Sequence, residues 1–253
     1  MGRGATGWED RRRREATLGG RLVYGYLAAF NVVMAAGWCL VAATLVSSAI
    51  YTASPLSALH LAFTNVGSLV LSLQLLVCME VVHMALAWVP PSTMNPLLLL
   101  HCKVLRRLHL LVVAYFGVPQ VHQTAALGFV FVHWAVVDLI RYPFYLLNMV
   151  RACPPLLKWM RYSEFIVMYP ISFTSEMYLW WVMYPYIREW PLEQREGSLE
   201  AAAATLYGWL LLAYLAWRVS TFPFNYRRML RLRGHKDQGG PSPAAVGATT
   251  KAD

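Results

Sequence analysis

The stretch "EFIVMYPISFTSEMYLWW", from Glu164 to Trp181, is apolar enough to lie in a lipid bilayer, yet it holds a tyrosine and a glutamate near its centre. An ionised side chain at bilayer depth costs about 2.5–3.5 kcal/mol on insertion scales, so such residues tend to face a protein interior and to be functional. Tyr169 and Glu176 are seven positions apart, which on an ideal helix falls within about 20° of two full turns. We therefore expect both side chains to lie on one face of a helix and to point into one cavity.

These two side chains suit general acid–base chemistry. A tyrosine hydroxyl can donate a proton, and a glutamate can accept one, or donate one if burial keeps it neutral. Pro170 follows the tyrosine directly and is expected to kink or loosen the helix, which would shorten the distance between the two groups. The spacing alone leaves a second interpretation equally open, in which the tyrosine is a core aromatic residue and the glutamate pairs with a neighbouring arginine.

The composition of the whole chain is that of a membrane protein with several spans. Of its 253 residues, 58% are hydrophobic and only 14% are charged, whereas a soluble domain carries about 25% charged residues. The net charge of +9 could suggest a nucleic-acid partner, but the basic residues gather at 11–14 and 227–236, just outside apolar runs. Because membrane topology signals have this placement, we expect no nucleic acid as a partner. The four cysteines show no paired spacing, which argues against disulfides and a zinc site.

Six apolar segments are long enough to cross a bilayer, which needs about 20 residues of helix. The expected fold class is therefore all-α, a polytopic membrane bundle of six transmembrane helices. The expected spans cover residues 24–46, 59–88, 97–117, 122–149, 160–186 and 203–225.

The distribution of lysine and arginine predicts the orientation of the spans. Both ends of the chain are basic, so both are expected in the cytosol, which requires an even number of spans. The 187–202 loop, with only two arginines, then lies on the opposite side of the membrane. We accordingly expect a basic cytosolic tail at 1–22, a membrane domain at 23–228 and a disordered cytosolic tail at 229–253.

Further charged and polar residues fall within the expected spans, and the topology places most of them at one level. Glu80 and Arg141 each lie eight residues before the cytosolic end of their span, about 12 Å inside. This predicts a polar pocket that opens to the cytosol, with an apolar interior beyond it. Ion pairs that only hold the bundle together remain an equally open interpretation. The other members of this set are His83, Lys103, Arg106, Arg107 and Asp138.

Two of these residues have a specific alternative. The segment "EVVH" at 80–83 has the Glu-x-x-His spacing that di-iron bundles use, but the sequence has no second such step. We therefore expect no metal and interpret His83 as a core histidine. Arg107 could also extend its side chain to the membrane interface.

Four motifs and Glu176, through their order and spacing, support a resemblance to a known family. The chain resembles the very-long-chain (3R)-3-hydroxyacyl-CoA dehydratases, also called the protein-tyrosine-phosphatase-like membrane proteins, over residues 26–228. The motifs are "YLAAFNVVMAAGW" (26–38), "MEVVHMALAWVPPS" (79–92), "WAVVDLIRYPFYLLN" (134–148) and "KWMRYSEFIVMYP" (158–170).

The resemblance implies a six-helix bundle of the endoplasmic reticulum membrane that encloses an acyl-chain cavity, with both termini in the cytosol. It implies a hydro-lyase that dehydrates a (3R)-3-hydroxyacyl-CoA to the trans-2-enoyl-CoA, the third step of fatty acid elongation, without a cofactor or a metal. The other elongation enzymes would be its partners. The family's catalytic residues fall on Tyr169 and Glu176, and its substrate-binding residues fall on Arg141, Tyr142, Tyr145 and, through a looser alignment, Arg107.

The sequence departs from the family pattern between the two catalytic positions. Family members usually have glycines there, whereas this chain reads "ISFTS" with the bulkier Phe173, and Asp138 stands where a glutamate is common. These changes bear on the width of the pocket and on chain-length preference.

Other functions remain as alternatives. A non-catalytic scaffold of the elongation complex would keep the same fold, whereas a transporter of the inverted-repeat kind is not supported because no internal repeat is evident. No cysteine lies in a glycine-rich, phosphate-binding loop, so phosphatase activity is not expected. The N-terminal "MGRGAT" fits the pattern for myristoylation at Gly2. The sequence leaves open the acyl chain length, the oligomeric state, the partner enzymes, the modification of Gly2, and which of the two catalytic residues is the acid.

Overall fold

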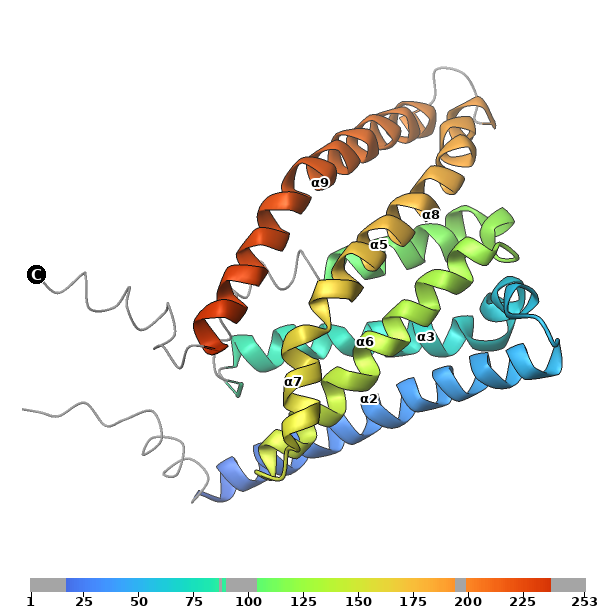
Figure 1. Cartoon of the computed structure of the whole chain (residues 1–253). Coiled ribbons are helices and arrows are strands. Elements are labelled where there is room, and N and C mark those ends of the chain that lie inside the picture. The colour runs from blue at the N-terminus through green and yellow to red at the C-terminus, as the bar shows by residue number, and fades with distance from the viewer. Residues whose placement is uncertain (1–16, 87, 90–103, 194–198, 238–253) are drawn as a thin grey trace, which may run out of the picture.

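The computed structural model describes residues 17–86, 88–89, 104–193 and 199–237 (Figure 1). Over these ranges the chain forms seven α-helices, two short turns of other helix types and no strand, which confirms the all-α prediction. The α-helices are α2 (Leu18–Tyr51), α3 (Pro55–Ala85), α5 (Arg106–Val112), α6 (Ala125–Met149), α7 (Pro155–Ser163), α8 (Phe165–Glu193) and α9 (Leu199–Asp237). The π-helical turn η2 (Val113–Gly117) and the 3-10 turn η3 (Pro119–Val121) follow α5.

Local sequence signals define the sharp connection between α2 and α3. Ala53 adopts a positive φ of 48°, so the chain reverses direction there. Ser54 then caps α3 by accepting a hydrogen bond from the backbone N–H of Ser57 at 3.2 Å, and Pro55 occupies the first helical position, where no N–H is needed.

Four of these helices are long and apolar enough to span a membrane: α2, α3, α6 and the Leu199–Arg231 part of α9. The chain is therefore a multi-pass membrane protein by helix length and composition, but six spans were expected. The first residues of the expected third span, 97–103, lie outside the described part of the chain, and Lys103 is among them. The fifth is carried by α8, which is long but includes Ser172, Ser175 and Glu176 and is not among the four.

Several helix boundaries differ from those expected, and three of the differences concern α7, α8 and α9. The segment 160–186 is divided at Glu164, because α7 ends at Ser163 and α8 begins at Phe165. At its other end α8 continues to Glu193, into the region expected to be a loop. Helix α9 continues to Asp237, past the expected end of the membrane domain at 228.

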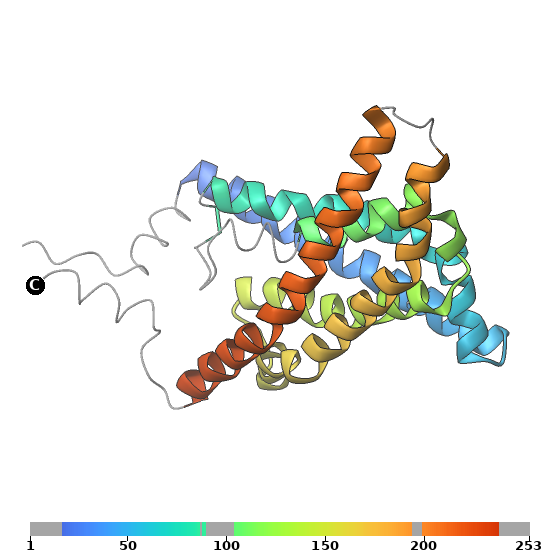
Figure 2. The same ribbon diagram turned by 90° about the horizontal axis from the view of Figure 1, so that it is seen from above.

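The arrangement of the helices explains where buried polar groups can meet. Helices α2, α3 and α6 pack against one another, α8 packs against α6, and α9 packs against α8 at the outer edge of the bundle (Figures 1 and 2). The start of α2, helix α7 and the end of α9 lie at the same end of the bundle (Figure 1). This placement fits an even number of membrane crossings.

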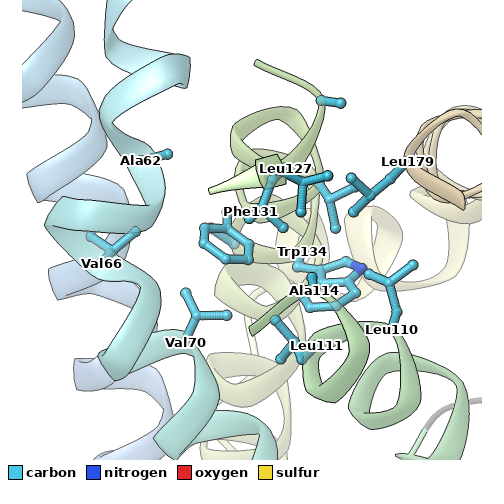
Figure 3. Packing of buried hydrophobic residues seen from close by; sticks show 14 of the residues in the cluster. Ala62, Val66, Val70, Leu110, Leu111, Ala114, Leu127, Phe131, Trp134 and Leu179 are labelled. Carbon is cyan, nitrogen blue, oxygen red and sulfur yellow. The ribbon is translucent and has the colours of Figure 1, made fainter. Parts of the chain in front are cut away.

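The hydrophobic core is formed by α2, α3, α5, α6 and α8, and Figure 3 shows the part where α3, α5, α6 and α8 converge. Val66 and Val70 of α3 face Phe131 of α6, and Trp134 is fully buried beside them. Gly128 allows α3 and α6 to approach closely, because a side chain at this position would collide with the backbone carbonyl of Leu59. Large apolar side chains on the outside of the bundle are exposed, as lipid contact requires, for example Ile50 (75%), Trp181 (76%) and Trp209 (68%).

Candidate active site

Glu176 lies on α8 and is only 1% exposed. Its Oε2 atom contacts two arginines from two other helices: Arg106 Nη1 of α5 donates a hydrogen bond at 2.9 Å, and Arg218 Nη1 of α9 lies at 3.2 Å. The carboxylate therefore joins α8 to α5 and to α9. This is the arginine pairing that the spacing left open as an alternative to an acid–base role.

The other oxygen, Oε1, accepts two hydrogen bonds from neutral donors. Trp134 Nε1–H of α6 donates at 3.2 Å, and Ser172 Oγ–H, one turn earlier on α8, donates at 3.1 Å. His133 Nε2 lies 3.0 Å from Ser172 Oγ and 3.9 Å from Oε1. Because the serine hydroxyl hydrogen points to Glu176, its oxygen accepts from His133, which assigns a proton to Nε2.

Tyr169 lies two turns before Glu176 and faces α9. Its half-buried ring stacks nearly parallel to Phe222 and Tyr226, with ring centroids 5.3 and 6.0 Å apart. Arg218, Phe222 and Tyr226 follow one another at intervals of four residues, so they occupy one face of α9. Tyr169 and Glu176 contact the same face of α9 and hence lie on the same side of α8, as their spacing predicts. A shared acyl-chain cavity stays a prediction.

A second buried network is centred on Asp138 of α6, which is 0% exposed. Its two oxygens contact two arginines, Arg107 Nη1 at 2.7 Å and Arg141 Nη2 at 2.6 Å. Arg141 Nη2 also donates to Tyr142 Oη at 3.0 Å, and Tyr142 Oη–H donates to Glu80 Oε1 at 2.7 Å. The structure thus brings together three of the four predicted substrate-binding residues and pairs their charges within the protein.

Tyr145, the fourth of these residues, connects the Asp138 network to α7. Its ring packs edge-on against Tyr142 at 6.3 Å, and its hydroxyl accepts a hydrogen bond of 3.4 Å from Arg161. Arg161 in turn forms an ion pair of 2.8 Å with Glu164. The break between α7 and α8 is therefore tied to the same network.

Trp134 links the two networks. Arg107 lies over its ring, with Cζ 4.9 Å from the centroid, while its indole N–H donates to Glu176. Within the described part of the chain, no group of three histidine, cysteine, aspartate or glutamate side chains is placed to hold a metal ion.

Four contributors to the Glu176 site were not identified as site residues from the sequence: His133, Trp134, Ser172 and Arg218. Arg218 had a usable signal, since it is a charged residue inside the apolar run 203–225. The other three are common core or helix residues, and no sequence feature marks them as neighbours of Glu176.

Comparisons with known proteins agree with the resemblance. The family model described as "Protein tyrosine phosphatase-like protein, PTPLA" matches residues 74–238. The chain is 27% identical over 213 residues to "Very-long-chain (3R)-3-hydroxyacyl-CoA dehydratase 2" of Homo sapiens, covering 84% of this chain and 80% of that protein. It is 24% identical over 214 residues to "Very-long-chain (3R)-3-hydroxyacyl-CoA dehydratase 1" of Mus musculus, covering 85% and 73%.

A third relative is "Very-long-chain (3R)-3-hydroxyacyl-CoA dehydratase" of Danio rerio, at 23% identity over 226 residues, covering 89% of this chain and 61% of that protein. No solved structure matches the chain significantly. The family model covers more than half of the sequence and includes α6, α8 and α9, which carry most of both networks. The chain therefore belongs to the protein tyrosine phosphatase-like, or PTPLA, family.

Proposed function

We propose that the protein is a hydro-lyase that converts a (3R)-3-hydroxyacyl-CoA to the trans-2-enoyl-CoA in very-long-chain fatty acid elongation. Its curated relatives carry the name of this activity. The observation that carries the proposal is the position of Tyr169 and Glu176 on one side of α8, both against α9. A carboxylate and a hydroxyl on one face supply the base and the acid that such a dehydration needs.

The proposed mechanism assigns the base to Glu176 and the acid to Tyr169. Glu176 takes the C2 proton, and by the end of the reaction the electrons of the C2–H bond form the double bond between C2 and C3. The C3–O bond breaks as Tyr169 gives its proton to the leaving hydroxyl, so water departs. A proton then returns from Glu176 to the tyrosine oxygen. The thioester makes C2 acidic, so the chain's own side chains suffice for every step.

Arg141, Tyr142, Tyr145 and Arg107 are proposed to bind the CoA part of the substrate. Guanidinium groups bind phosphate through several charge-assisted hydrogen bonds. In the described part of the chain, Nε of Arg107 and Nε of Arg141 have no hydrogen-bond partner, so both arginines retain a donor beyond their contacts with Asp138. These free N–H donors support a role in phosphate binding for two arginines that already form buried ion pairs.

The finer architecture is also part of the proposal. We infer six membrane spans around an acyl-chain cavity, in which each buried CH₂ group of the substrate contributes about 0.8 kcal/mol. The charge distribution supports a membrane domain at 23–228 with both tails in the cytosol. The resemblance supports a location in the endoplasmic reticulum and an association with other elongation enzymes.

The test compares purified wild-type protein with Tyr169→Phe and Glu176→Gln on 3-hydroxyacyl-CoAs of graded chain length. Each variant should lose dehydration by about 100–10,000-fold, because each removes one proton-transfer group. Tyr226→Phe is the matched control, since it removes a stacked tyrosine's hydroxyl, which among the described residues bonds the Ile166 carbonyl alone, at 2.9 Å. Near-normal turnover by both site variants would refute the assignment.

One observation favours the alternative of a non-catalytic scaffold. Four donors contact the Glu176 carboxylate, as they would in a structural ion pair. Depletion of the protein from cells discriminates between the two functions: a dehydratase leaves 3-hydroxyacyl-CoA to accumulate, and depletion of a scaffold lowers all elongation intermediates together.

A further inference from the structure

The surroundings of Glu176 place a constraint on the proposed reaction. A carboxylate offers about four lone-pair positions. In the described part of the chain, Glu176 accepts three hydrogen bonds, from Arg106, Trp134 and Ser172, and Arg218 Nη1 lies 3.2 Å from Oε2 as a fourth neighbour. For Glu176 to accept the C2 proton, one of these four neighbours must give up its position. The inference below rests on the proposed function and identifies that donor.

Three of the four donors are well held. Trp134 is fully buried, and its ring lies under the guanidinium of Arg107. Arg106 makes a well-aligned hydrogen bond of 2.9 Å. Ser172 belongs to α8 itself, and its oxygen is bound at the same time by His133.

Arg218 differs from these three because it contacts the carboxylate only as a charge. Its Nη1 lies 3.2 Å from Oε2, yet no acceptor among the described residues makes a hydrogen bond to this nitrogen. The side chain is 8% exposed. Buried donors without a partner are rare in folded proteins, so this N–H group is available for a ligand atom.

Two aromatic rings hold the guanidinium in place. Arg218 Cζ lies 5.5 Å from the ring centroid of Phe173 on α8 and 6.0 Å from that of Tyr214 on α9. The first ring belongs to the segment between Tyr169 and Glu176. The donor is therefore positioned beside the base without a hydrogen bond to it.

We propose that Arg218 Nη1 binds the thioester oxygen of the substrate and stabilises the enolate that forms when Glu176 takes the C2 proton. In this step the C2–H electrons form a C1–C2 double bond and the carbonyl π electrons move onto the oxygen. The electrons on the oxygen then re-form the carbonyl, the C1–C2 double-bond electrons form the C2–C3 double bond, and the C3–O bond breaks. Because C2 is bonded directly to the carbonyl carbon, the base and the oxyanion donor must be neighbours, as Oε2 and Nη1 are.

The charges of the site fit this role. Glu176 faces two guanidinium groups, so the site carries one surplus positive charge before the reaction. Proton uptake neutralises the carboxylate and creates a negative charge on the thioester oxygen. The Arg218 guanidinium can move a short distance to bind this oxygen, while Arg106 keeps its hydrogen bond to Glu176.

The first experiment measures dehydration by Arg218→Gln, Arg218→Lys and the control Ser220→Ala. Within the described part of the chain, the Ser220 hydroxyl donates to the Ala216 carbonyl of its own helix and to no other group. Removing one oxyanion donor typically lowers kcat by about 100–1,000-fold. We expect such a loss for Arg218→Gln with a smaller change in KM, and partial recovery for Arg218→Lys. Exchange of the C2 protons of a saturated acyl-CoA in D₂O isolates the enolate step, and it should fall by a similar factor.

A second experiment separates contact with the substrate from a structural role. A thioether analogue of the acyl-CoA lacks the carbonyl oxygen, so the wild-type protein should bind it more weakly than the thioester, and Arg218→Gln should bind both equally. If the variant keeps the wild-type preference, or exchanges C2 protons at the wild-type rate, this inference is wrong while the proposed function stands. A wild-type protein that dehydrates none of the substrates overturns both.

Discussion

The two buried charge networks of this protein differ in their balance. The Asp138 network contains two carboxylates and two guanidinium groups, so its formal charges cancel. The Glu176 network contains one carboxylate and two guanidinium groups, and the surplus is positive. A balanced network suits the joining of helices, because no buried charge is left without a partner. A positive surplus suits a reaction in which negative charge develops on a substrate.

The networks also differ in the helices that they join. The Asp138 network connects α3, α5 and α6 in the centre of the bundle. The Glu176 network includes α9, which lies at one edge of the bundle (Figure 1), through Arg218. A bundle can thus keep balanced charges at its centre and a carboxylate that is proposed to react beneath a peripheral helix.

Asp138→Asn should have the largest effect on stability. It leaves two buried guanidinium groups without a carboxylate between them, and breaking one buried pair typically costs about 3–5 kcal/mol. The measurement is the free energy of unfolding in mixed micelles by denaturing-detergent titration. Asp138→Glu, which keeps the charge, is the control, and a loss below about 1 kcal/mol would show that the Asp138 network does not hold the helices together.

Trp134→Phe tests the connection between the two networks. It keeps a ring in the core but removes the N–H donor to Glu176, and hydrogen bonds to charged groups contribute about 1.5–3 kcal/mol. The matched control is Trp180→Phe, because Trp180 is equally buried and its Nε1 has no hydrogen-bond partner in the described part of the chain. Equal unfolding free energies for the two variants would mean that the indole hydrogen bond contributes nothing.

Glu80→Gln should have the smallest effect. Glu80 has 15% of its side chain exposed, and a glutamine can still accept the hydrogen bond from Tyr142. We expect a loss of about 0.5–1.5 kcal/mol. Combining it with Tyr142→Phe in a double-mutant cycle measures the coupling of the two residues. A loss as large as that of Asp138→Asn would show that the network depends on its outer charge.

Much of the fold followed from apolar segment length. Four expected spans correspond to helices of the required length and composition, although α7 and α8 divide a segment that was expected to be one helix. Apolar segment length did not predict their boundary at Glu164, where Arg161 contacts both Glu164 and Tyr145 in the tertiary structure.

The sequence by itself determined that this is an all-helical membrane protein, and it determined that Tyr169 and Glu176 share one side of a helix. Both conclusions are local, since they depend on hydrophobic length and on the 3.6-residue period of the helix. The partners of each charge depended on the tertiary structure. Adjacent residues on a helix point about 100° apart, so Arg106 reaches Glu176 while Arg107 reaches Asp138. Only the packing of α5, α6, α8 and α9 decides which carboxylate each arginine meets, and only that packing brings Arg218 to the site.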